Sequence, residues 1–464
     1  MPFILDLNQV IVYANTQKSI IKRLFSWYFA YLFVPLQYQS KKDGMKILIV
    51  NTSERTGGAA VAANRLMKAL NNYGAKAKML VRDKDTDALT VSALPPSPRL
   101  RWQFLWERLC IFLKLHFSRQ HLFEIDIANA GSDITRLREF KEADIIHLHW
   151  INQGMLSLSG IQKILRSGKP VVWTMHDIWP ATAICHVTLD CRSFTSQCCR
   201  CRLLPGGGSA HDLAASVWQK KLRMLEGESV SFVACSRWLE SEAKKSALLK
   251  GQKITSIPNP IDTHIYKRGV KEEARKRLGL PLDKRLILFA SQRVTTENKG
   301  MRYLIDACRR LTEGQAPCAV VILGGHAEEV VAQLPMEAYP LGYVNDEKRI
   351  VQVYQAVDVF VLPSLSENLP NTIMEAMACG VPCVGFKVGG IPEEIDHQRN
   401  GYVAAYRDAE DLARGIRWIL TEADYESLSR QAVEKVVRNY SLQSVAMQYL
   451  EVYHQALAFK HYKL

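Results

Sequence analysis

The sequence predicts an α/β protein with two Rossmann-like, doubly wound domains. Of its 464 residues, 48% are hydrophobic and 23% are charged, which is close to the globular average and sufficient for two buried cores. From Met45 onward, short apolar segments alternate with segments of helical periodicity, a pattern typical of a parallel sheet covered on both faces. The alternation stops at a turn-rich passage near residue 262 and then restarts, so we expect two sheets that face each other across a cleft.

The expected elements follow one another along the chain. In the first half, strands are expected at residues 47–51, 77–82, 144–149, 171–175 and 230–235, with helices such as 59–72 and 236–247 between them. In the second half, strands are expected at residues 286–291, 319–323, 358–363 and 381–386, with helices that begin near Gly300, Asp346, Asn371 and Asp408. We therefore divide the chain into an extension (1–44), an N-terminal domain (45–262) with a cysteine-rich insert (185–208), a C-terminal domain (263–440) and a last helix (441–464) that packs back toward the N-terminal domain.

Composition narrows the classes of function. Sixty Lys and Arg residues against 46 Asp and Glu residues give a net charge of +14. This excess suits an anionic partner, which is a nucleic acid, a phosphorylated metabolite or an anionic membrane face. Nucleic acid is disfavoured because the sequence has no stacking platform and no basic helix in a nucleic-acid-binding motif. The expected location is the cytoplasm, with peripheral association at the inner face of the cell membrane.

The extension, residues 1–44, differs in composition from the rest. Its most apolar stretch, residues 24–36, is thirteen residues long, whereas a membrane span needs about 20. Lys22 and Arg23 precede this stretch as in a signal peptide, but no small-residue cleavage site follows. Three interpretations stay open: Met45 is the true start, the aromatic segment rests on a membrane, or a signal peptide is removed.

A second segment, residues 99–117, does not read as a Rossmann strand. Its periodicity predicts a helix with Trp102, Trp106 and Leu109 on one broad apolar face, among interspersed Arg and Lys residues. A helix that lies on a membrane surface has this pattern, and so does an ordinary helix packed on its domain. The sequence favours neither.

The most informative stretch lies between Pro363 and Glu393. A buried strand ends at a loop, Pro370 stands in the first turn of a helix, and Gly380 ends that helix. The unpaired N–H groups at the helix start form an anion site. Glu367 and Glu375 flank this turn, and because carboxylates repel phosphate, sugar hydroxyls are their natural partners. Alternatively, Glu375 is a solvated helix residue.

The spacing Glu367-x7-Glu375, followed by EAMACGVPCV and GGIPE, resembles the family 4 retaining glycosyltransferases. These enzymes have the GT-B fold, in which two Rossmann-like domains hold a nucleotide sugar in the cleft between them. The resemblance extends from about Met45 to the end of the chain. A cysteine-rich insert next to WTMHDIWP is similar to that of colanic-acid-type exopolysaccharide enzymes in the family.

The resemblance implies a role for several residues. Arg293 and Lys299 would bind the donor diphosphate, although Gln292 stands where the family usually has Gly. Glu367 would bond the hydroxyls of the donor sugar and Glu375 those of the ribose. The segment from Asn368 to Asn371 would hold sugar and phosphate through the backbone N–H groups of Asn368, Leu369 and Asn371, with Pro370, which has no N–H, between them.

Further matches lie in both halves of the chain. Gly57 and Gly58 resemble the glycine loop that approaches donor and acceptor. Gly324, Tyr343 and Val344 belong to stretches that resemble the walls of the nucleobase pocket. Residues 257–262 resemble the family's IPNGID stretch, with Pro260 in place of Gly, which makes the turn stiffer.

His176 ends an expected strand in the predicted cleft. By the resemblance it would face the donor sugar and help to hold an oxocarbenium-like state, although a single histidine at a strand end is often structural. Asp177 would orient it or cap the next turn. His147 and His149 stand at another strand end, where they either support the acceptor side or pack.

Five cysteines fall within 17 residues, from Cys185 to Cys201. Four thiolates can complete a tetrahedral zinc site, and we predict the set Cys185, Cys191, Cys198 and Cys201 as structural ligands, with Cys199 left over. Reduced free thiols and disulfides remain alternatives. No cofactor is expected for catalysis, since Asp83-Lys84-Asp85 reads as a solvated loop.

The sequence thus predicts a glycosyltransferase of exopolysaccharide or capsule biosynthesis. Its partners would be a nucleoside-diphosphate sugar as donor, a lipid-linked or oligosaccharide acceptor, and an anionic membrane surface. A nucleotide-sugar epimerase of related fold and a non-catalytic nucleotide-sugar-binding protein are the alternatives. The donor base, the sugar and the linkage cannot be read from these residues.

Overall fold

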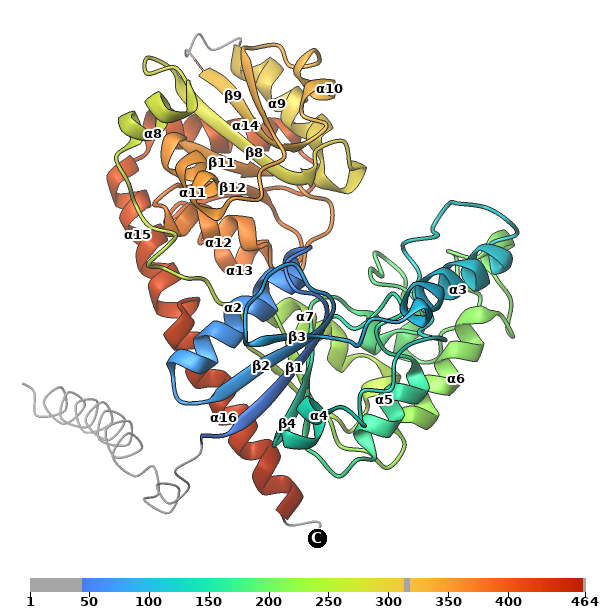
Figure 1. Cartoon of the computed structure of the whole chain (residues 1–464). Coiled ribbons are helices and arrows are strands. Elements are labelled where there is room, and N and C mark those ends of the chain that lie inside the picture. The colour runs from blue at the N-terminus through green and yellow to red at the C-terminus, as the bar shows by residue number, and fades with distance from the viewer. Residues whose placement is uncertain (1–43, 313–317, 462–464) are drawn as a thin grey trace, which may run out of the picture. The chain divides into compact units, whose positions relative to one another are not determined.

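The computed structural model describes residues 44–312 and 318–461. Within these residues the chain forms two parallel sheets, one of seven strands and one of six, and helices connect successive strands (Figure 1). The predicted α/β class with two Rossmann-like domains is therefore confirmed. The three interpretations of the extension concern residues 1–43, which lie outside the described residues.

The first sheet has the strand order β3-β2-β1-β4-β5-β6-β7, and every pair is parallel. Its strands are β1 (Lys46–Ser53), β2 (Lys76–Asp83), β3 (Val91–Ala93), β4 (Ile145–Leu148), β5 (Val171–Met175), β6 (Ser231–Ala234) and β7 (Lys253–Ser256). The helices of this domain are α2 (Gly58–Asn72), α3 (Pro98–Lys114), α4 (Arg138–Glu142), α5 (Leu158–Leu165), α6 (Leu213–Leu225) and α7 (Arg237–Lys244). Strand β7 has no counterpart among the predicted elements because only Ile254 of its four residues is buried.

The second sheet has the strand order β10-β9-β8-β11-β12-β13. Its strands are β8 (Arg285–Arg293), β9 (Cys318–Gly325), β10 (Ala338–Gly342), β11 (Val359–Leu362), β12 (Cys383–Phe386) and β13 (Gly401–Ala404). Its helices are α8 (Lys271–Leu278), α9 (Met301–Thr312), α10 (Glu328–Val331), α11 (Glu347–Ala356), α12 (Asn371–Ala378), α13 (Ile391–Glu394), α14 (Ala409–Arg417) and α15 (Tyr425–Asn439). In both sheets the strand order reverses beside the first strand, and ligands of open α/β sheets bind at the carboxyl ends of strands near such a point.

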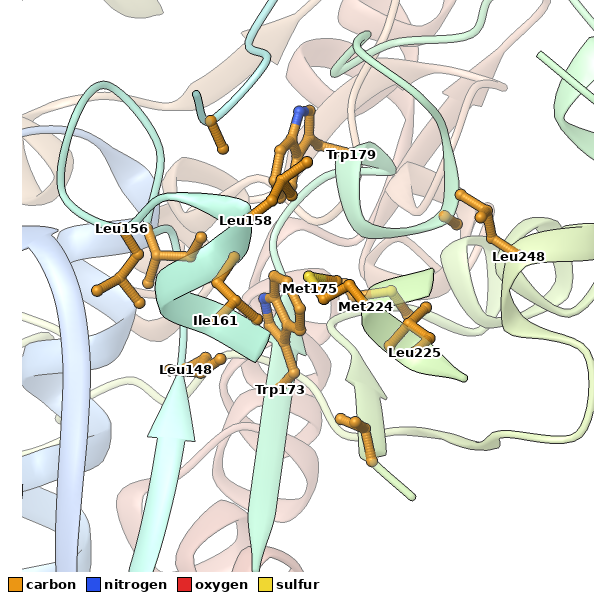
Figure 2. Packing of buried hydrophobic residues seen from close by; sticks show 14 of the residues in the cluster. Leu148, Leu156, Leu158, Ile161, Trp173, Met175, Trp179, Met224, Leu225 and Leu248 are labelled. Carbon is orange, nitrogen blue, oxygen red and sulfur yellow. The ribbon is translucent and has the colours of Figure 1, made fainter. Parts of the chain in front are cut away.

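The core of the first domain holds the segment that follows β5. Trp173 and Trp179 are buried between α5 and α6, and their ring centroids are 6.3 Å apart (Figure 2). The Nε1 group of Trp179 donates to the backbone oxygen of Asp126, at 2.8 Å. Because both tryptophans are fixed, the residues between them, which include His176, have a defined position at the carboxyl end of the sheet.

Helix α16 (Leu442–His461) returns from the second domain to the first, where it packs against α2 (Figure 1). Tyr453 contacts Nδ1 of His147 through its hydroxyl at 2.7 Å, and Tyr449 contacts Thr174 at 2.8 Å. Nε2 of His147 lies 2.7 Å from the same Thr174 hydroxyl. His147 therefore packs under α16, which is the packing alternative of the two that the sequence left open.

Candidate functional site

A cavity of about 730 Å³ lies between the two domains. The first domain contributes His176 and Asp177 to its wall, and the second contributes Lys299, Glu367 and Asn368. Four residues predicted for the site, His176, Lys299, Glu367 and Asn368, therefore surround one cavity. The cavity lies at the carboxyl ends of β5 and β11, as expected for a ligand site in sheets of this kind.

Lys299 and Glu367 form an ion pair in the cavity wall, and their side chains are 31% and 13% exposed. Two loops are held together to make this pair. Leu365 donates its backbone N–H to the oxygen of Asn298 at 2.8 Å, and the Asn298 amide donates to the oxygen of Ser366 at 3.1 Å. A cation and a carboxylate thus stand side by side on a rigid base, where each can engage a different part of one ligand.

Gly389 and Gly390 lie directly against the backbone of the Glu367 loop. A Cβ atom on Gly389 would lie 1.7 Å from the backbone oxygen of Glu367, and one on Gly390 would lie 2.0 Å from that of Asn368. Gly389 also has a φ of +57°, which favours glycine. The glycine pair of the GGIPE stretch therefore permits the close approach that fixes Glu367.

Asn368 joins the two domains. Its Nδ2 group donates to the backbone oxygen of His176 at 3.0 Å, and its Oδ1 atom accepts from the hydroxyl of Ser236 at 2.5 Å. Ser236 also caps α7 by accepting from the N–H of Leu239. The side chain of Asn368 therefore fixes the distance between His176 and the Glu367 loop.

His176 lies in a group of buried polar residues. Its Nε2 atom is 2.9 Å from Nδ1 of His149, and its Nδ1 atom is 3.4 Å from the sulfur of Cys235. Burial lowers the pKa of His176 to about 4, against a small opposing effect of Asp177. The imidazole is therefore neutral at pH 7 and does not repel a developing positive charge. A sugar hydroxyl would have to replace one of its two present partners, His149 or Cys235, in order to bond to it.

Asp177 belongs to a second network of polar side chains in the wall of the cavity. His186, which also lines the cavity, places Nδ1 2.8 Å from Asp177 and Nε2 2.7 Å from Asp126. Burial opposes the charged form, but the two carboxylates raise the pKa of His186 to about 10. His186 is thus an imidazolium between two carboxylates, and it fixes the loop that carries Asp177. Asp177 also accepts from the N–H of Trp179, which corresponds to the suggested capping of the next turn. The partners of the His176 ring are His149 and Cys235, so the suggested orienting of His176 by Asp177 stays a prediction.

Glu375 is not solvated. Its Oε1 atom lies 2.7 Å from Nη2 of Arg65 in α2, and its Oε2 atom accepts from the hydroxyl of Tyr354 at 3.1 Å. Next to this pair, the Asn371 side chain donates to the backbone oxygen of Gly58 at 3.0 Å. The interpretation of Glu375 as a solvated residue is therefore wrong. Its predicted bond to a ribose stays a prediction, and Arg65 would have to release it.

Other predicted residues lie outside the walls of the 730 Å³ cavity. Arg293 ends β8 with its side chain exposed, and its Nε group donates to Thr295 at 3.1 Å. Tyr343 is 61% exposed in the loop after β10. Gly324 meets the backbone of Ser291, because a Cβ there would lie 1.8 Å from the Ser291 oxygen. The remaining residues outside these walls are Gly57, Gly58, Val344, Leu369, Pro370, Asn371 and Glu375.

The cysteine insert carries the four thiols that the sequence predicts as zinc ligands. Among the described residues, no group of three or more His, Cys, Asp or Glu side chains is arranged to hold a metal ion. Cys185, Cys191, Cys198 and Cys201 carry free thiols. Burial raises the pKa of Cys185 to about 11 and that of Cys198 to about 12, so both stay protonated, and Cys198 packs in the hydrophobic core. Zinc binding by these four cysteines stays a prediction.

Sequence reasoning missed Arg65, Asp126 and the roles of His186 and Gly389. Arg65 gave one signal, since the other buried residues of its helix are Ala, Leu and Met. Asp126 gave none, because its partners are distant in the sequence.

Two sheets of this topology with a site between them define the GT-B class of enzymes. Solved structures with this fold include sucrose-phosphate synthase from Thermosynechococcus elongatus, which is 19% identical, with a TM-score of 0.62 and coverage of 89% of this chain and 99% of that one. Anabaena HepE, solved with UDP and glucose, is 17% identical, with a TM-score of 0.59 and coverage of 89% and 100%. Both likenesses show the fold.

The family follows from the sequence itself. Residues 56–265 match the profile described as Glycosyltransferase Family 4, and residues 270–435 match Glycosyl transferases group 1. The protein therefore belongs to the family 4 glycosyltransferases, enzymes that use nucleotide sugars as donors.

Curated relatives are distant. An uncharacterized glycosyltransferase of Methanocaldococcus jannaschii is 26% identical over 72% of this chain and 90% of its own length. The N-acetyl-alpha-D-glucosaminyl L-malate synthase of Bacillus anthracis is 25% identical over 44% of this chain, and the match spans about half of that relative, 54%. A Bacillus subtilis glycosyltransferase named for teichuronic acid biosynthesis is 33% identical over 37% of this chain and 42% of its own length.

Proposed function

We propose that the protein transfers a hexose-type sugar, with retention of configuration, from a nucleoside diphosphate to a hydroxyl group of a surface-polysaccharide acceptor, which is lipid-linked. The observation that carries this proposal is the Lys299–Glu367 pair opposite His176 in one cavity. The relative named for teichuronic acid biosynthesis supports the choice of acceptor class, and the HepE structure with UDP and glucose supports a UDP-sugar donor.

The reaction breaks the bond between the anomeric carbon and the diphosphate oxygen, and the electron pair stays on that oxygen. Lys299 stabilises the charge that grows there. The acceptor oxygen bonds to the anomeric carbon on the same face, and its proton passes to the leaving phosphate oxygen, so no side chain acts as general base. Glu367 accepts hydrogen bonds from the sugar hydroxyls, and neutral His176 faces the sugar. Arg293 would add a second cation, Glu375 would bond the ribose, and the amides near Asn371 would hold phosphate.

The proposed location is the cytoplasm, at the inner face of the cell membrane, where a lipid-linked acceptor of exopolysaccharide or capsule synthesis would be found. None of the helices in the described part of the chain is both long and apolar enough to cross a bilayer. The proposed association with the membrane is peripheral and uses the excess of basic residues, 60 against 46 acidic.

A donor panel tests the proposal. The purified protein is heated with UDP-, GDP-, ADP- and dTDP-sugars, and the melting temperature is recorded without acceptor. One nucleotide sugar should stabilise the protein by about 2.7 kcal/mol at a concentration 100-fold above its Kd. Lys299→Ala should abolish the shift, whereas Lys276→Ala, at an exposed position in α8, should not. A shift that survives in Lys299→Ala would remove that residue from the donor site, and no shift with any nucleotide sugar would contradict the proposal.

A further inference from the structure

Helix α3 exposes its apolar face and buries its polar one. Trp102 is 68% exposed and Trp106 54%, and the other exposed apolar residues of the same face are Leu105, Leu109 and Leu113. These positions follow the spacing i, i+3, i+4, i+7 and i+11, which puts them on one side of a helix. The buried residues of the helix are Gln103, Glu107, Arg108 and Ile111, so three of the four are polar. A stripe of this kind normally faces the core, and here it faces outward.

Two polar side chains, Glu107 and Arg108, fix this orientation. One carboxylate oxygen of Glu107 accepts from the N–H groups of Ile127 at 2.9 Å and Ala128 at 2.7 Å. Arg108 pairs with Asp126 and donates to the backbone oxygen of Leu122 at 2.7 Å. Rotating the helix to bury its tryptophans would leave these groups without partners, and an unpaired buried charge is strongly destabilising. The apolar face is therefore exposed because the polar residues on the opposite side need their buried partners.

The turn that follows α3 extends the apolar surface. Phe117 is 69% exposed and has a φ of +63°, a conformation that residues other than glycine seldom adopt. Its ring lies 5.6 Å from that of Phe112 in an edge-to-face arrangement. Phe123, further along, is also exposed. We call the exposed side of residues 98–123 the α3 surface.

The α3 surface is basic as well as aromatic. Arg99, Arg101, Lys114 and Arg119 are exposed on or beside it, and none of them forms an ion pair within the described residues. The one acidic residue of α3, Glu107, is buried. Tryptophan, phenylalanine and leucine on one face with Arg and Lys beside them are the composition of a helix that lies in the headgroup region of an anionic bilayer.

The α3 surface and the cavity share one carboxylate. Asp126 accepts from Arg108 of α3 at its Oδ1 atom and contacts Nε2 of His186 at its Oδ2 atom. His186 in turn lines the cavity beside Asp177. The helix is thus joined to the wall of the cavity by two successive side-chain contacts.

We propose that the α3 surface docks the protein on an anionic lipid bilayer and so presents the cavity to an acceptor held in that bilayer. The proposal names the membrane partner of the function proposed above and rests on it for the acceptor. Docking itself is tested without sugar transfer. A second copy of the chain or another protein would be a different occupant, and the positive charge of the surface favours the bilayer over both.

Vesicle co-sedimentation of the full chain tests docking. We compare vesicles of phosphatidylcholine with vesicles that contain a third phosphatidylglycerol. The wild type should bind the anionic vesicles preferentially. The variant W102S/W106S should bind on the order of 10- to 100-fold more weakly, because two large apolar side chains are removed from the interface. The variant R99Q/R101Q should bind anionic vesicles with roughly 30-fold lower affinity, since each basic residue raises the affinity about fivefold.

A matched variant, L282S/V437S, removes two exposed apolar side chains elsewhere and should bind like the wild type. All variants should keep the melting temperature and the donor-induced shift of the wild type, because they touch no residue of the cavity. Equal binding by wild type and W102S/W106S would overturn the proposal. The proposal would also be overturned if the wild type is a dimer, W102S/W106S is a monomer, and neither protein binds vesicles. If wild type binds vesicles but no nucleotide sugar, the proposed function fails and docking stands.

Discussion

The buried ion pair between Arg65 and Glu375 offers the sharpest test of how the two domains are held. Arg65 lies in α2 of the first domain and Glu375 in α12 of the second, and their side chains are 6% and 11% exposed. The guanidinium also lies over the ring of Tyr266, 4.9 Å from its centroid. At an effective dielectric constant of about 20, unit charges at the observed separation of 2.7 Å attract by roughly 6 kcal/mol. Removing both ions from water offsets much of this attraction.

We expect Arg65→Met to lower the free energy of unfolding by about 3–5 kcal/mol, because it leaves the Glu375 carboxylate buried with only the Tyr354 hydroxyl as partner. Glu375→Gln should lose less, because Arg65 then keeps the longer contact with Glu347 at 3.9 Å. The double variant Arg65→Met/Glu375→Gln should lose clearly less than the sum, with a coupling energy of about 1–3 kcal/mol. Urea unfolding of the four proteins measures these values.

The control is Arg277→Met, which removes an exposed arginine paired with Glu273 within α8. Its loss should be no more than about 0.5 kcal/mol. Losses below about 1 kcal/mol for Arg65→Met, or strictly additive losses in the double variant, would refute the view that this pair holds the domains together.

Three further outcomes are expected. Glu367→Ala should lower turnover by at least about 100-fold with the melting temperature maintained, because the sugar loses its hydrogen-bond acceptor in the cavity wall. Release of nucleoside diphosphate measures the turnover, and Glu273→Ala is the control. Wild-type turnover by Glu367→Ala would contradict the role of Glu367. Burial lowers the pKa of His147 to about 3 and that of His176 to about 4. Both histidines bind no proton when the protein is folded but do so when it is unfolded below about pH 6.5. Stability should therefore fall between pH 6.5 and 4, by up to about 1.4 kcal/mol per pH unit for each histidine. A flat urea midpoint over that range would show that these imidazoles are not buried neutral. Gly389→Ala should reduce both turnover and melting temperature, because the added Cβ would meet the Glu367 backbone. The control Gly168→Ala, at a φ of +84° with open space around it, should show only the backbone strain of about 1 kcal/mol. Equal effects of the two substitutions would rule out a role for the close approach between Gly389 and Glu367.

The fold and the centre of the site could be predicted because their signals are local. The strands that end at His176 and before Glu367 are apolar runs, and Pro370 marks the start of a helix within the same short stretch. The pairing of Arg65 with Glu375 could not be predicted, since the two residues are 310 positions apart and no sequence spacing connects them. Packing between domains, which the local pattern does not contain, decides what such residues touch.

The α3 helix shows a different limit. Its apolar stripe predicted the helix correctly, but the same stripe suits a buried face and an exposed one. Its orientation depends on the polar partners Asp126 and the N–H groups of Ile127 and Ala128. None of these has a pattern of its own in the sequence. The cysteine insert is similar, because the spacing of thiols does not reveal whether burial or a metal ion brings them near one another.

The return of α16 to the first domain has a consequence for how the chain folds during synthesis. The segment with Tyr449 and Tyr453 leaves the ribosome after the C-terminal domain, yet it covers His147 and Thr174 in the middle of the first sheet. Until that segment arrives, one face of the first domain is open and its buried polar groups lack their partners. The N-terminal domain therefore completes its folding only after the whole C-terminal domain has been made, and a chain cut at the domain boundary would leave two incomplete pieces.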